Sequence, residues 1–312
     1  MTSALSPQVP SSLLHQRLLD WYSREARDLP WRQAGTSPWG ILVSEVMLQQ
    51  TPVSRVEPVW LQWMSVWPSP AALADSPPGD AVRAWGRLGY PRRALRLHAA
   101  ATAMVERHQG LVPDSHQDLM ALPGVGSYTA AAVASFAFEA RATVVDTNIR
   151  RVLARMVSGS EHAAPSLTRA ETDLATSLLP TERHTASAWN VAVMELGALI
   201  CTARSPRCPD CPLVDLCAWQ QAGRPAYPGP ARRVQPWHGT DRQARGRLMA
   251  VLREATGPVT ASRMALAWPD DSAQCQRALD SLVVDGLVEP LPRQRFQLPG
   301  HREGGDHPDE AG

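Results

Sequence analysis

Apolar residues recur along most of the chain at the three- and four-residue spacing that is typical of amphipathic helices. Residues 12–28 form the first such segment, and an Asp-Leu-Pro-Trp-Arg sequence breaks it. A second helix is predicted from Trp39 to Gln50, because Ser37 and Pro38 suit its N-cap and first turn. Further helical segments before residue 201 are predicted near 58–108, 127–138, 147–156, 167–179 and 186–200. Little in this part indicates strands, so the pattern predicts an all-α fold.

The pattern changes after residue 221, and a linker rich in Pro, Gly and Arg is predicted over 222–240. Beyond the linker, three helices and a β-hairpin are predicted at Arg242–Glu254, Ala261–Trp268, Ser272–Val284 and Gly286–Leu298. This order predicts a small winged-helix-like module over 241–299. Its one cysteine, Cys275, suits packing better than ligation. Residues 1–11 and 300–312 are expected to be disordered.

The stretch Leu-Pro-Gly-Val-Gly-Ser-Tyr-Thr-Ala (122–130) joins a short helix to a longer one. Pro123 ends the first helix, since proline lacks an amide hydrogen. Gly124 and Gly126 permit positive φ and let a ligand approach the backbone. Free amides at the start of the next helix, from Ser127, attract an anion, usually a phosphate. The stretch predicts a hairpin that grips a nucleic-acid backbone, although such a turn can also be a mere connection.

Two carboxyl side chains stand out by their positions on predicted helices. Glu45 shares an apolar helix face with Ile41 and Leu48, and burial there would raise its pKa. Such a group is either paired structurally or kept protonated as a proton donor, and the sequence leaves both open. Asp146 precedes the helix that starts at Thr147, so it suits an N-cap, where the helix dipole keeps it ionised.

Composition limits the possible partners and location. The net charge is +1, with 31 basic and 30 acidic residues, and every basic residue counted there is arginine, since the chain has no lysine. No apolar run reaches the length of a membrane span, and the N-terminus lacks the features of a signal peptide, so we expect a cytoplasmic protein. One local cluster, Gly86–Arg96, combines an aromatic ring with four arginines. It suits stacking on bases and pairing with phosphates, or a solvated helix face.

Four of the five cysteines lie in one short segment with the spacing C-x6-C-x2-C-x5-C, at Cys201, Cys208, Cys211 and Cys217. Four thiolates can hold zinc or a [4Fe–4S] cluster. Structural zinc sites usually have two close cysteine pairs and only one pair is close here, so the spacing favours iron–sulfur. The first role of the cluster would be to fix a loop. Arg204 and Arg207 in that loop would face phosphate or solvent.

Seven segments appear in order along the chain: Leu-Pro-Trp (29–31), Ser-Glu-Val-Met-Leu-Gln-Gln-Thr (44–51), a Leu-Gly-Tyr sequence ending at Tyr90, Leu-Pro-Gly-Val-Gly-Ser-Tyr-Thr-Ala (122–130), Val-Val-Asp-Thr-Asn (144–148), Met-Glu-Leu-Gly-Ala (194–198) and the four-cysteine loop. Over residues 12–220 this combination closely resembles the MutY-type adenine DNA glycosylases of the helix-hairpin-helix glycosylase superfamily. The resemblance implies a glycosylase core over 12–221, with an iron–sulfur half from 12–30 and 140–221 and a six-helix half from 31–139. It also implies base excision repair in a bacterial cytoplasm, at the nucleoid.

The resemblance implies a monomeric enzyme that excises adenine mispaired with 8-oxoguanine or guanine in double-stranded DNA. Glu45 would protonate adenine N7 and then help to activate water, and Asp146 would stabilise or transiently capture the oxocarbenium sugar. These roles agree with an acid on an apolar face and a carboxylate at a helix start. The other matched positions are Trp31, Arg32 and Leu48 for the adenine pocket, Gln50 and Tyr90 for the wedge that fills the gap left by the flipped base, Gly124 and Gly126 for the phosphate grip, and Asn148 for the substrate.

Tyr128 and three departures refine this expectation. Relatives that also cut the backbone, such as endonuclease III, place a lysine at the position of Tyr128, so a chain without lysine predicts a monofunctional glycosylase. Residues 241–300 are too short and wrongly patterned for the Nudix-like domain that helps typical members recognise 8-oxoguanine. Pro91 stands where a second tyrosine is common, and Val191 where a polar pocket residue is common.

Two other functions remain open from the sequence. A thymine or uracil mismatch glycosylase of the same superfamily shares the tyrosine, the aspartate and the glutamate, but the Gln49-Gln50 pair favours adenine. A non-catalytic iron–sulfur protein that binds DNA is the second, and the presence of both Glu45 and Asp146 argues against it.

Overall fold

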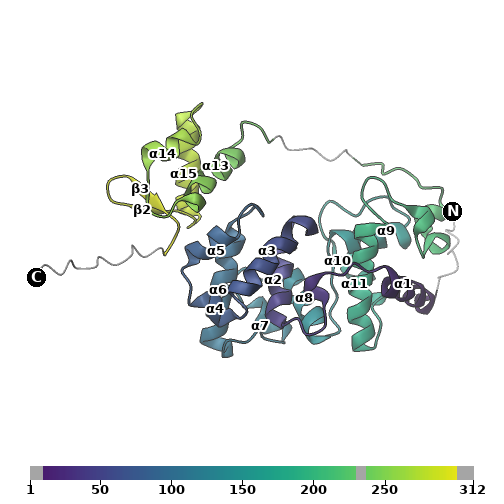
Figure 1. The fold of residues 1–312 in the computed structure, drawn as a ribbon. Coiled ribbons are helices and arrows are strands. Elements are labelled where there is room, and N and C mark those ends of the chain that lie inside the picture. The colour runs from purple at the N-terminus through teal and green to yellow at the C-terminus, as the bar shows by residue number, and fades with distance from the viewer. Residues whose placement is uncertain (1–9, 230–236, 301–312) are drawn as a thin grey trace, which may run out of the picture. The chain divides into compact units, whose positions relative to one another are not determined.

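The computed structural model describes residues 10–229 and 237–300, and helices form most of it (Figure 1). The helices before the C-terminal region are α1 (Ser11–Glu25), α2 (Pro38–Leu48), α3 (Val53–Val66), α4 (Pro70–Ala74), α5 (Pro78–Ala84), α6 (Arg92–His108), α7 (His116–Met120), α8 (Ser127–Phe138), α9 (Thr147–Met156), α10 (Arg169–Ser177), α11 (Arg183–Leu199) and α12 (Ala218–Gln221), with 3-10 turns η1 (Pro30–Arg32), η2 (Cys208–Asp210) and η3 (Val214–Leu216). Within the described ranges no strand precedes residue 259, which confirms the all-α prediction for this part. None of the helices in these ranges combines the length and the apolar character that a membrane crossing requires. The predictions for residues 1–9, 230–236 and 301–312 lie outside the described residues.

Contacts divide the chain into two compact units. Among the described residues, the first unit comprises 10–45, 114–121 and 125–229, and the second comprises 46–113, 122–124 and 237–300. Each unit is therefore built from segments that are distant in the sequence. These units do not have the same boundaries as the domains predicted from the sequence. The predicted domains concern which parts of the chain fold independently, and they stay a prediction.

Helix α11 organises the core of the first unit and packs against α1, α8 and α9. Its buried face carries Trp189, Val193 and Leu196, at the i, i+4 and i+7 positions of one helix face. Leu18 of α1 and Leu153 of α9 belong to the same apolar cluster. Each such side chain contributes about 1.5–3 kcal/mol when fully buried, so this cluster holds together helices that are far apart in the sequence.

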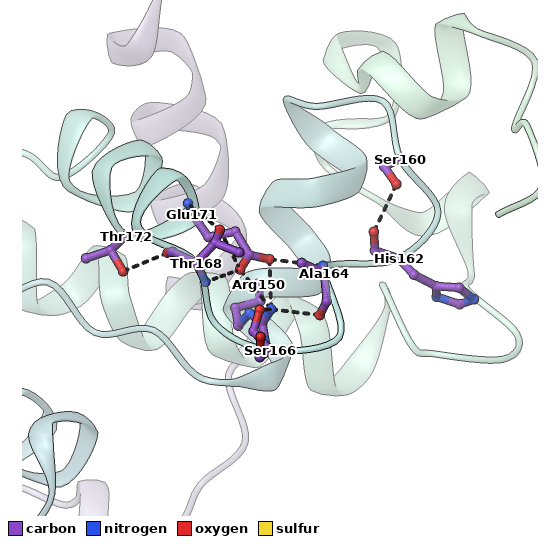
Figure 2. Close-up of polar contacts among 8 residues, drawn as sticks. All are labelled: Arg150, Ser160, His162, Ala164, Ser166, Thr168, Glu171 and Thr172. Atoms are coloured by element: carbon purple, nitrogen blue, oxygen red, sulfur yellow. Dashed lines mark hydrogen bonds and ion pairs between the residues drawn. The ribbon is translucent and has the colours of Figure 1, made fainter. Parts of the chain in front are cut away.

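The loop between α9 and α10 is anchored by one ion pair (Figure 2). Arg150 Nη2 donates to the carboxylate oxygens of Glu171 at 2.9 and 2.8 Å, and to the carbonyls of Ala164 and Ser166 at 2.8 and 2.7 Å. Glu171 also completes a capping box with Thr168 at the start of α10. The helix therefore begins two residues later than the apolar pattern predicted.

Helix α2 is buried almost all round, over residues 42–47. Ser37 Oγ accepts the amide hydrogen of Gly40 at 3.2 Å, as an N-cap does. The helix ends at Leu48 and not at Gln50, because Gln50 has a left-handed backbone with φ of 55°. A carboxylate placed on the buried segment is held away from water, which disfavours its charged form.

In the second unit, α6 packs against α4 and α5, beside a cluster of tryptophans. The ring centroid of Trp63 lies 4.6 Å from that of Trp67 and 5.7 Å from that of Trp85, in edge-to-face geometry. Such pairs add about 0.5–1.5 kcal/mol beyond their buried area. Because Trp85 Nε1 donates to the carbonyl of Gly89 at 2.9 Å, the cluster also fixes the turn that leads to Tyr90.

The C-terminal module contains α13 (Asp241–Glu254), α14 (Ala261–Leu266), α15 (Ser272–Val284), β1 (Val259–Thr260), β2 (Glu289–Leu291) and β3 (Arg295–Gln297). The strands form one antiparallel sheet in the order β1-β3-β2, and α13 packs on α15. Three helices with a small sheet confirm the winged-helix-like prediction. The sequence did not reveal β1, because a strand of two residues shows no alternation.

The module packs on α5 within the second unit. The amide of Gly79 donates to the carbonyl of Pro299 at 2.8 Å, and a Cβ on Gly79 would lie 2.7 Å from that oxygen. Arg83 donates to the carbonyl of Ala255 at 2.8 Å and also to that of Arg253. The end of α13 is thus capped by a side chain from α5, and only glycine fits where the two segments meet.

Candidate active site and cysteine loop

Glu45 and Tyr128 form the centre of the candidate site. The Tyr128 hydroxyl, on α8, donates to Glu45 Oε2, on α2, at 2.7 Å. Glu45 is 6% exposed, and burial raises its pKa to about 7; the hydrogen bond from Tyr128 lowers the pKa and the charge of Asp146 raises it. The sequence left open whether Glu45 pairs with a charge or donates a proton. A hydroxyl partner and a raised pKa favour the proton donor.

Asp146 caps α9, as predicted. Its Oδ1 accepts the amide hydrogen of Ile149 at 2.6 Å, and its Oδ2 accepts a hydrogen bond from Asn148 Nδ2 at 2.9 Å. Burial raises the pKa of Asp146 above its ordinary value, while these hydrogen bonds oppose the rise. The charge of Asp146 raises the pKa of both Glu45 and Tyr128, so the structure brings the three groups within electrostatic reach of one another.

Helix α9 also connects Asp146 to the cysteine loop. Arg151 Nη2 donates to Asn148 Oδ1 and to the carbonyl of Gly197, both at 2.7 Å, and its Nε donates to the carbonyl of Cys201 at 2.7 Å. A Cβ on Gly197 would lie 2.7 Å from the Cβ of Asn148, so α11 and α9 approach this closely only with glycine there. The position of Asp146 is thus tied to the conformation of the loop.

Arg32, predicted to line an adenine pocket, is held by a buried carboxylate. Glu195 on α11 has no exposed surface, and it accepts hydrogen bonds from Arg27 Nε and Nη2, both at 2.7 Å, and from Arg32 Nη2 at 2.9 Å. Burial alone raises the pKa of Glu195, but the hydrogen bonds from the two arginines hold it at about 2. Trp31 is buried beside Arg32 in η1. Sequence reasoning missed Glu195 as a site residue, although a carboxylate inside the apolar Met-Glu-Leu-Gly-Ala segment was a signal.

The two wedge candidates lie in the second unit and have the same unusual backbone. Gln50 and Tyr90 are exposed, with φ of 55° and 48°. Residues other than glycine are uncommon and strained in this left-handed region of φ. Each of the two side chains therefore projects from a specific turn. Leu48, the third candidate from this part of the chain, is the last residue of α2 and is half-buried.

The hairpin between α7 and α8 contains the two glycines that were singled out in the sequence. Helix α7 ends at Met120, before Pro123, and Gly124 has φ of +78° with its missing Cβ only 2.6 Å from the Cβ of Arg96. Gly126 does not use the positive φ that glycine permits: its φ of −96° is that of an extended N-cap. Apart from Gly126 and its two chain neighbours, no heavy atom of the described residues lies within 4 Å of a Cβ built there, so the start of α8 has room for a ligand.

The cysteine loop follows α11 and carries four partly buried free thiols, at Cys201, Cys208, Cys211 and Cys217. Burial raises the pKa of Cys211 to about 12, with the charges of the other three cysteines adding to the rise. The four sulfurs therefore lie close enough to act on one another, and bound iron would supply the positive charge that their thiolates need. Within the described residues, no group of His, Cys, Asp and Glu side chains lies close enough together to hold a single metal ion. A cubane cluster needs no such close approach, because it holds its four thiolates farther apart than a single ion does. The donor set fits a [4Fe–4S] cluster.

The cysteine loop is contacted by an arginine from α9, Arg155, and contains two arginines of its own, Arg204 and Arg207. Arg155 Nη1 lies 3.4 Å from Cys201 Sγ, and its guanidinium lies 4.8 Å from the ring centroid of Trp219. The sequence left Arg204 and Arg207 open between phosphate and solvent, and both are exposed. Arg207 Nη2 also donates to the carbonyl of Leu199 at 3.0 Å, so part of its side chain braces the loop.

A cavity lies elsewhere in the first unit. It has a volume of about 230 Å³ beside the anchored loop between α9 and α10, and its lining includes Val145, Arg150 and Leu174. None of the residues predicted for the site lines it. This cavity is therefore not the candidate site, which the polar groups around Glu45 define.

Comparisons with known proteins agree with this chemistry. Residues 43–176 match the family described as HhH-GPD superfamily base excision DNA repair protein, and residues 201–217 match the iron–sulfur binding domain of endonuclease III. A solved thermostable thymine-DNA glycosylase is 28% identical with a TM-score of 0.61, over 68% of this chain and 97% of that one. Endonuclease III in a non-covalent DNA complex, 23% identical with a TM-score of 0.57 over 69% and 99% of the chains, shares the fold. The fold and the site define a helix-hairpin-helix DNA glycosylase of base excision repair.

Sequence relatives narrow this class further. The adenine DNA glycosylase of Mycobacterium tuberculosis is 55% identical over 292 residues, which cover 93% of this chain and 95% of that protein. The adenine DNA glycosylase of Mycolicibacterium smegmatis is 54% identical over 92% of this chain and 97% of that protein. The chain belongs to the adenine DNA glycosylase family, and its cofactor is a [4Fe–4S] cluster. Because 292 residues exceed the glycosylase core, the similarity extends into the C-terminal module.

Proposed function

We propose that this chain excises adenine from double-stranded DNA and prefers adenine opposite 8-oxoguanine or guanine. The observation that carries the proposal is the Tyr128–Glu45 hydrogen bond at a buried carboxyl whose pKa is raised to about 7. Near neutral pH a substantial fraction of this carboxyl is protonated and can act as an acid. Acid catalysts work best when their pKa lies near the operating pH.

In the proposed reaction Glu45 gives its proton to N7 of the flipped adenine while the bond between N9 and the sugar C1′ breaks. The bonding electron pair leaves with the base, and the sugar becomes an oxocarbenium ion. Asp146, oriented by Ile149 and Asn148, stabilises or transiently captures this cation. Glu45, now a carboxylate, takes a proton from the water that adds to C1′, which leaves free adenine and an abasic site. One carboxyl must be protonated and the other ionised, and their different hydrogen-bond partners favour this division.

The same site supports a reaction without a lyase step. Cutting the backbone through an imine requires an amine at the sugar C1′, and the chain has tyrosine at position 128 and no lysine at all. Burial raises the pKa of Tyr128 well above its ordinary value, so its hydroxyl stays neutral and remains a hydrogen-bond donor to Glu45. The expected product is an uncut strand with an abasic site.

The remaining candidate residues are assigned to the base and the DNA backbone. Base recognition needs a pocket with a firm wall, and Glu195 holds Arg32 rigidly. Phosphate binding needs free amides, and the hairpin leaves the start of α8 open. The proposed contacts are Trp31, Arg32 and Leu48 with adenine, Asn148 with the nucleotide, Gly124 and Gly126 with a phosphate, and Gln50 and Tyr90 with the gap in the stack. Action as a monomer at the nucleoid in the cytoplasm stays a prediction.

Single-turnover assays on matched duplexes test the proposal. We expect release of adenine from A:8-oxoguanine and A:G pairs and no release of thymine from T:G pairs. Glu45→Gln and Asp146→Asn should each lower the rate by about 100-fold or more, whereas Glu106→Gln, an exposed residue on α6, should leave it unchanged.

Three outcomes would contradict the proposal in different ways. Release of thymine in place of adenine would indicate the mismatch glycosylase. Tight binding of DNA without release of any base would indicate a non-catalytic protein. Unchanged rates in both carboxyl variants would mean that Glu45 and Asp146 do not have the assigned roles.

A further inference from the structure

Arg93 is the arginine of the Gly86–Arg96 cluster that the structure buries. It lies in the first turn of α6 and is 8% exposed, while the other three arginines of the cluster are exposed. Its guanidinium donates one hydrogen bond to the hydroxyl of Thr51. It also donates to four backbone carbonyls, those of Val46, Met47, Gln49 and Gly89. Both sequence interpretations, a phosphate contact and a solvated helix face, are therefore wrong for Arg93.

Three of these hydrogen bonds close the C-terminal end of α2. Arg93 Nη1 lies 2.8 Å from the carbonyl oxygen of Val46, 3.2 Å from that of Met47 and 2.6 Å from that of Gln49. The last carbonyls of a helix have no partner inside it, and a positive charge there suits the helix dipole. The next residue is Gln50, with its left-handed backbone, so Arg93 supports the backbone from which that exposed side chain projects.

The other two hydrogen bonds reach the turn before α6. Arg93 Nη2 lies 3.1 Å from the carbonyl oxygen of Gly89 and 3.1 Å from Thr51 Oγ1, which donates to the carbonyl of Leu88 at 3.2 Å. The guanidinium lies 5.6 Å from the ring centroid of Tyr90, and the backbone amide of Arg93 donates to the Tyr90 carbonyl at 3.0 Å. One side chain thus joins two turns that are far apart in the sequence.

We propose that Arg93 is a positioning residue for base flipping, which locks the Gln50 and Tyr90 turns into one frame so that both side chains enter the duplex together. This rests on the proposed function, in which the two side chains fill the gap left by the flipped adenine. The planar guanidinium holds its donors on three nitrogens in a rigid fork, whereas the ammonium of a lysine carries all of its donors on one nitrogen. Without it, the carbonyls lose these hydrogen bonds and the hydroxyl of Thr51 alone joins the two turns among the contacts described above, so each turn is held less firmly to the other.

The test compares two substrates. In one the adenine is mispaired with guanine, and in the other it lies opposite an abasic-site analogue and so has no base pair to break. Arg93→Met keeps most of the length of the side chain and removes every donor. We expect its single-turnover release of adenine opposite guanine to fall about tenfold or more, equivalent to ~1.4 kcal/mol. Release of adenine opposite an abasic-site analogue should fall less than about threefold, because that adenine needs little help to leave the stack.

Two matched variants and a direct readout accompany this comparison. Arg93→Lys, which keeps the charge, should recover only part of the lost rate, and Arg107→Met, exposed on the same helix, should change neither rate. 2-Aminopurine at the target position reports flipping, and its fluorescence should rise more slowly or less with Arg93→Met than with the wild type. If Arg93→Met fails to fold, Thr51→Val removes the hydroxyl between the turns and should lower the mispaired rate about threefold.

Each result decides the proposal. A selective loss on the mispaired adenine supports a positioning role, because a general defect would lower both rates. Equal losses on the two substrates, or no loss on either, would overturn that role. A wild-type protein that releases adenine from neither substrate would overturn the proposed function itself, and with it the role of Arg93.

Discussion

Glu45→Gln should make the raised pKa of Glu45 measurable as a gain in stability at high pH. Between pH 4.5 and about 7 the folded chain keeps a proton on Glu45 that the unfolded chain has released. Stability therefore falls as pH rises through this window, and the cost is complete above pH 7. Glutamine cannot ionise, and its side-chain oxygen can still accept the hydrogen bond from Tyr128.

The size of the effect follows from the two pKa values. A change from 4.5 to about 7, at 1.36 kcal/mol per pH unit, corresponds to about 3 kcal/mol at pH 8 and to almost nothing at pH 4.5. In a folding unit of 150–250 residues each kcal/mol moves Tm by roughly 2–4 °C. The variant should therefore melt about 6 °C or more above the wild type at pH 8, and close to it at pH 4.5.

Thermal melts of both proteins from pH 4.5 to 8.5, followed by circular dichroism, measure this difference. The absorbance of the iron–sulfur cluster should be recorded in the same samples, because cluster loss would lower stability independently. In the same pH series, the wild-type single-turnover rate should fall above pH 7, because Glu45 then loses the proton that it donates to adenine. Asn148→Ala is a suitable control, since it changes a neighbour of the site without removing this titration.

A constant difference in Tm at all pH values would refute this reasoning, since it would mean that Glu45 does not change its charge in this window. A wild type that gains stability between pH 5 and 8 relative to the variant would be more damaging. It would mean that the folded chain favours the Glu45 carboxylate, so that Glu45 could not be the acid.

Four further changes have defined outcomes. Tyr128→Phe removes a hydrogen bond that favours the Glu45 carboxylate, so the fall of the rate should begin about 1 pH unit higher, and an unmoved pH profile would contradict the pairing. Tyr128→Lys supplies the missing amine, and borohydride should trap this variant on abasic DNA while it traps little of the wild type. Arg155→Met removes the donor to Cys201 Sγ, and iron analysis should show about tenfold weaker retention of iron under chelation. Glu195→Gln leaves two half-buried arginines without their buried carboxylate and should cost about 3 kcal/mol in urea unfolding at pH 7, whereas a cost below about 1 kcal/mol would show that the ion pair is not structural.

The corrections to the sequence predictions share one physical origin. Arg93 belongs to a run of arginines that suits phosphates, yet it is buried because the carbonyls at the end of α2 meet it there. Glu195 is one carboxylate in an apolar helix until Arg27 and Arg32 reach it from segments more than 160 residues away. Neither pairing follows a local periodicity, so no pattern along the chain indicates it.

What the sequence determined by itself was local. The spacing of Cys201, Cys208, Cys211 and Cys217 indicated the cluster, and the turn around Gly124 indicated the hairpin, since short covalent spacings limit what such residues can form. The absence of lysine excluded a lysyl imine whatever the fold, and Asp146 caps α9 through neighbours within three residues. These features depend on backbone geometry and side-chain chemistry within a few residues.

The tertiary structure decided which groups have shifted pKa values and which turns are held together. The pKa of Glu45 depends on how completely α2 is buried and on a hydroxyl 83 residues away, and neither is encoded by the residues next to it. Gln50 and Tyr90 become related only because Arg93 donates to both turns. Desolvation and long-range hydrogen bonds exist only once distant segments pack together, which is why the charge states in the site follow from the fold and not from the sequence pattern.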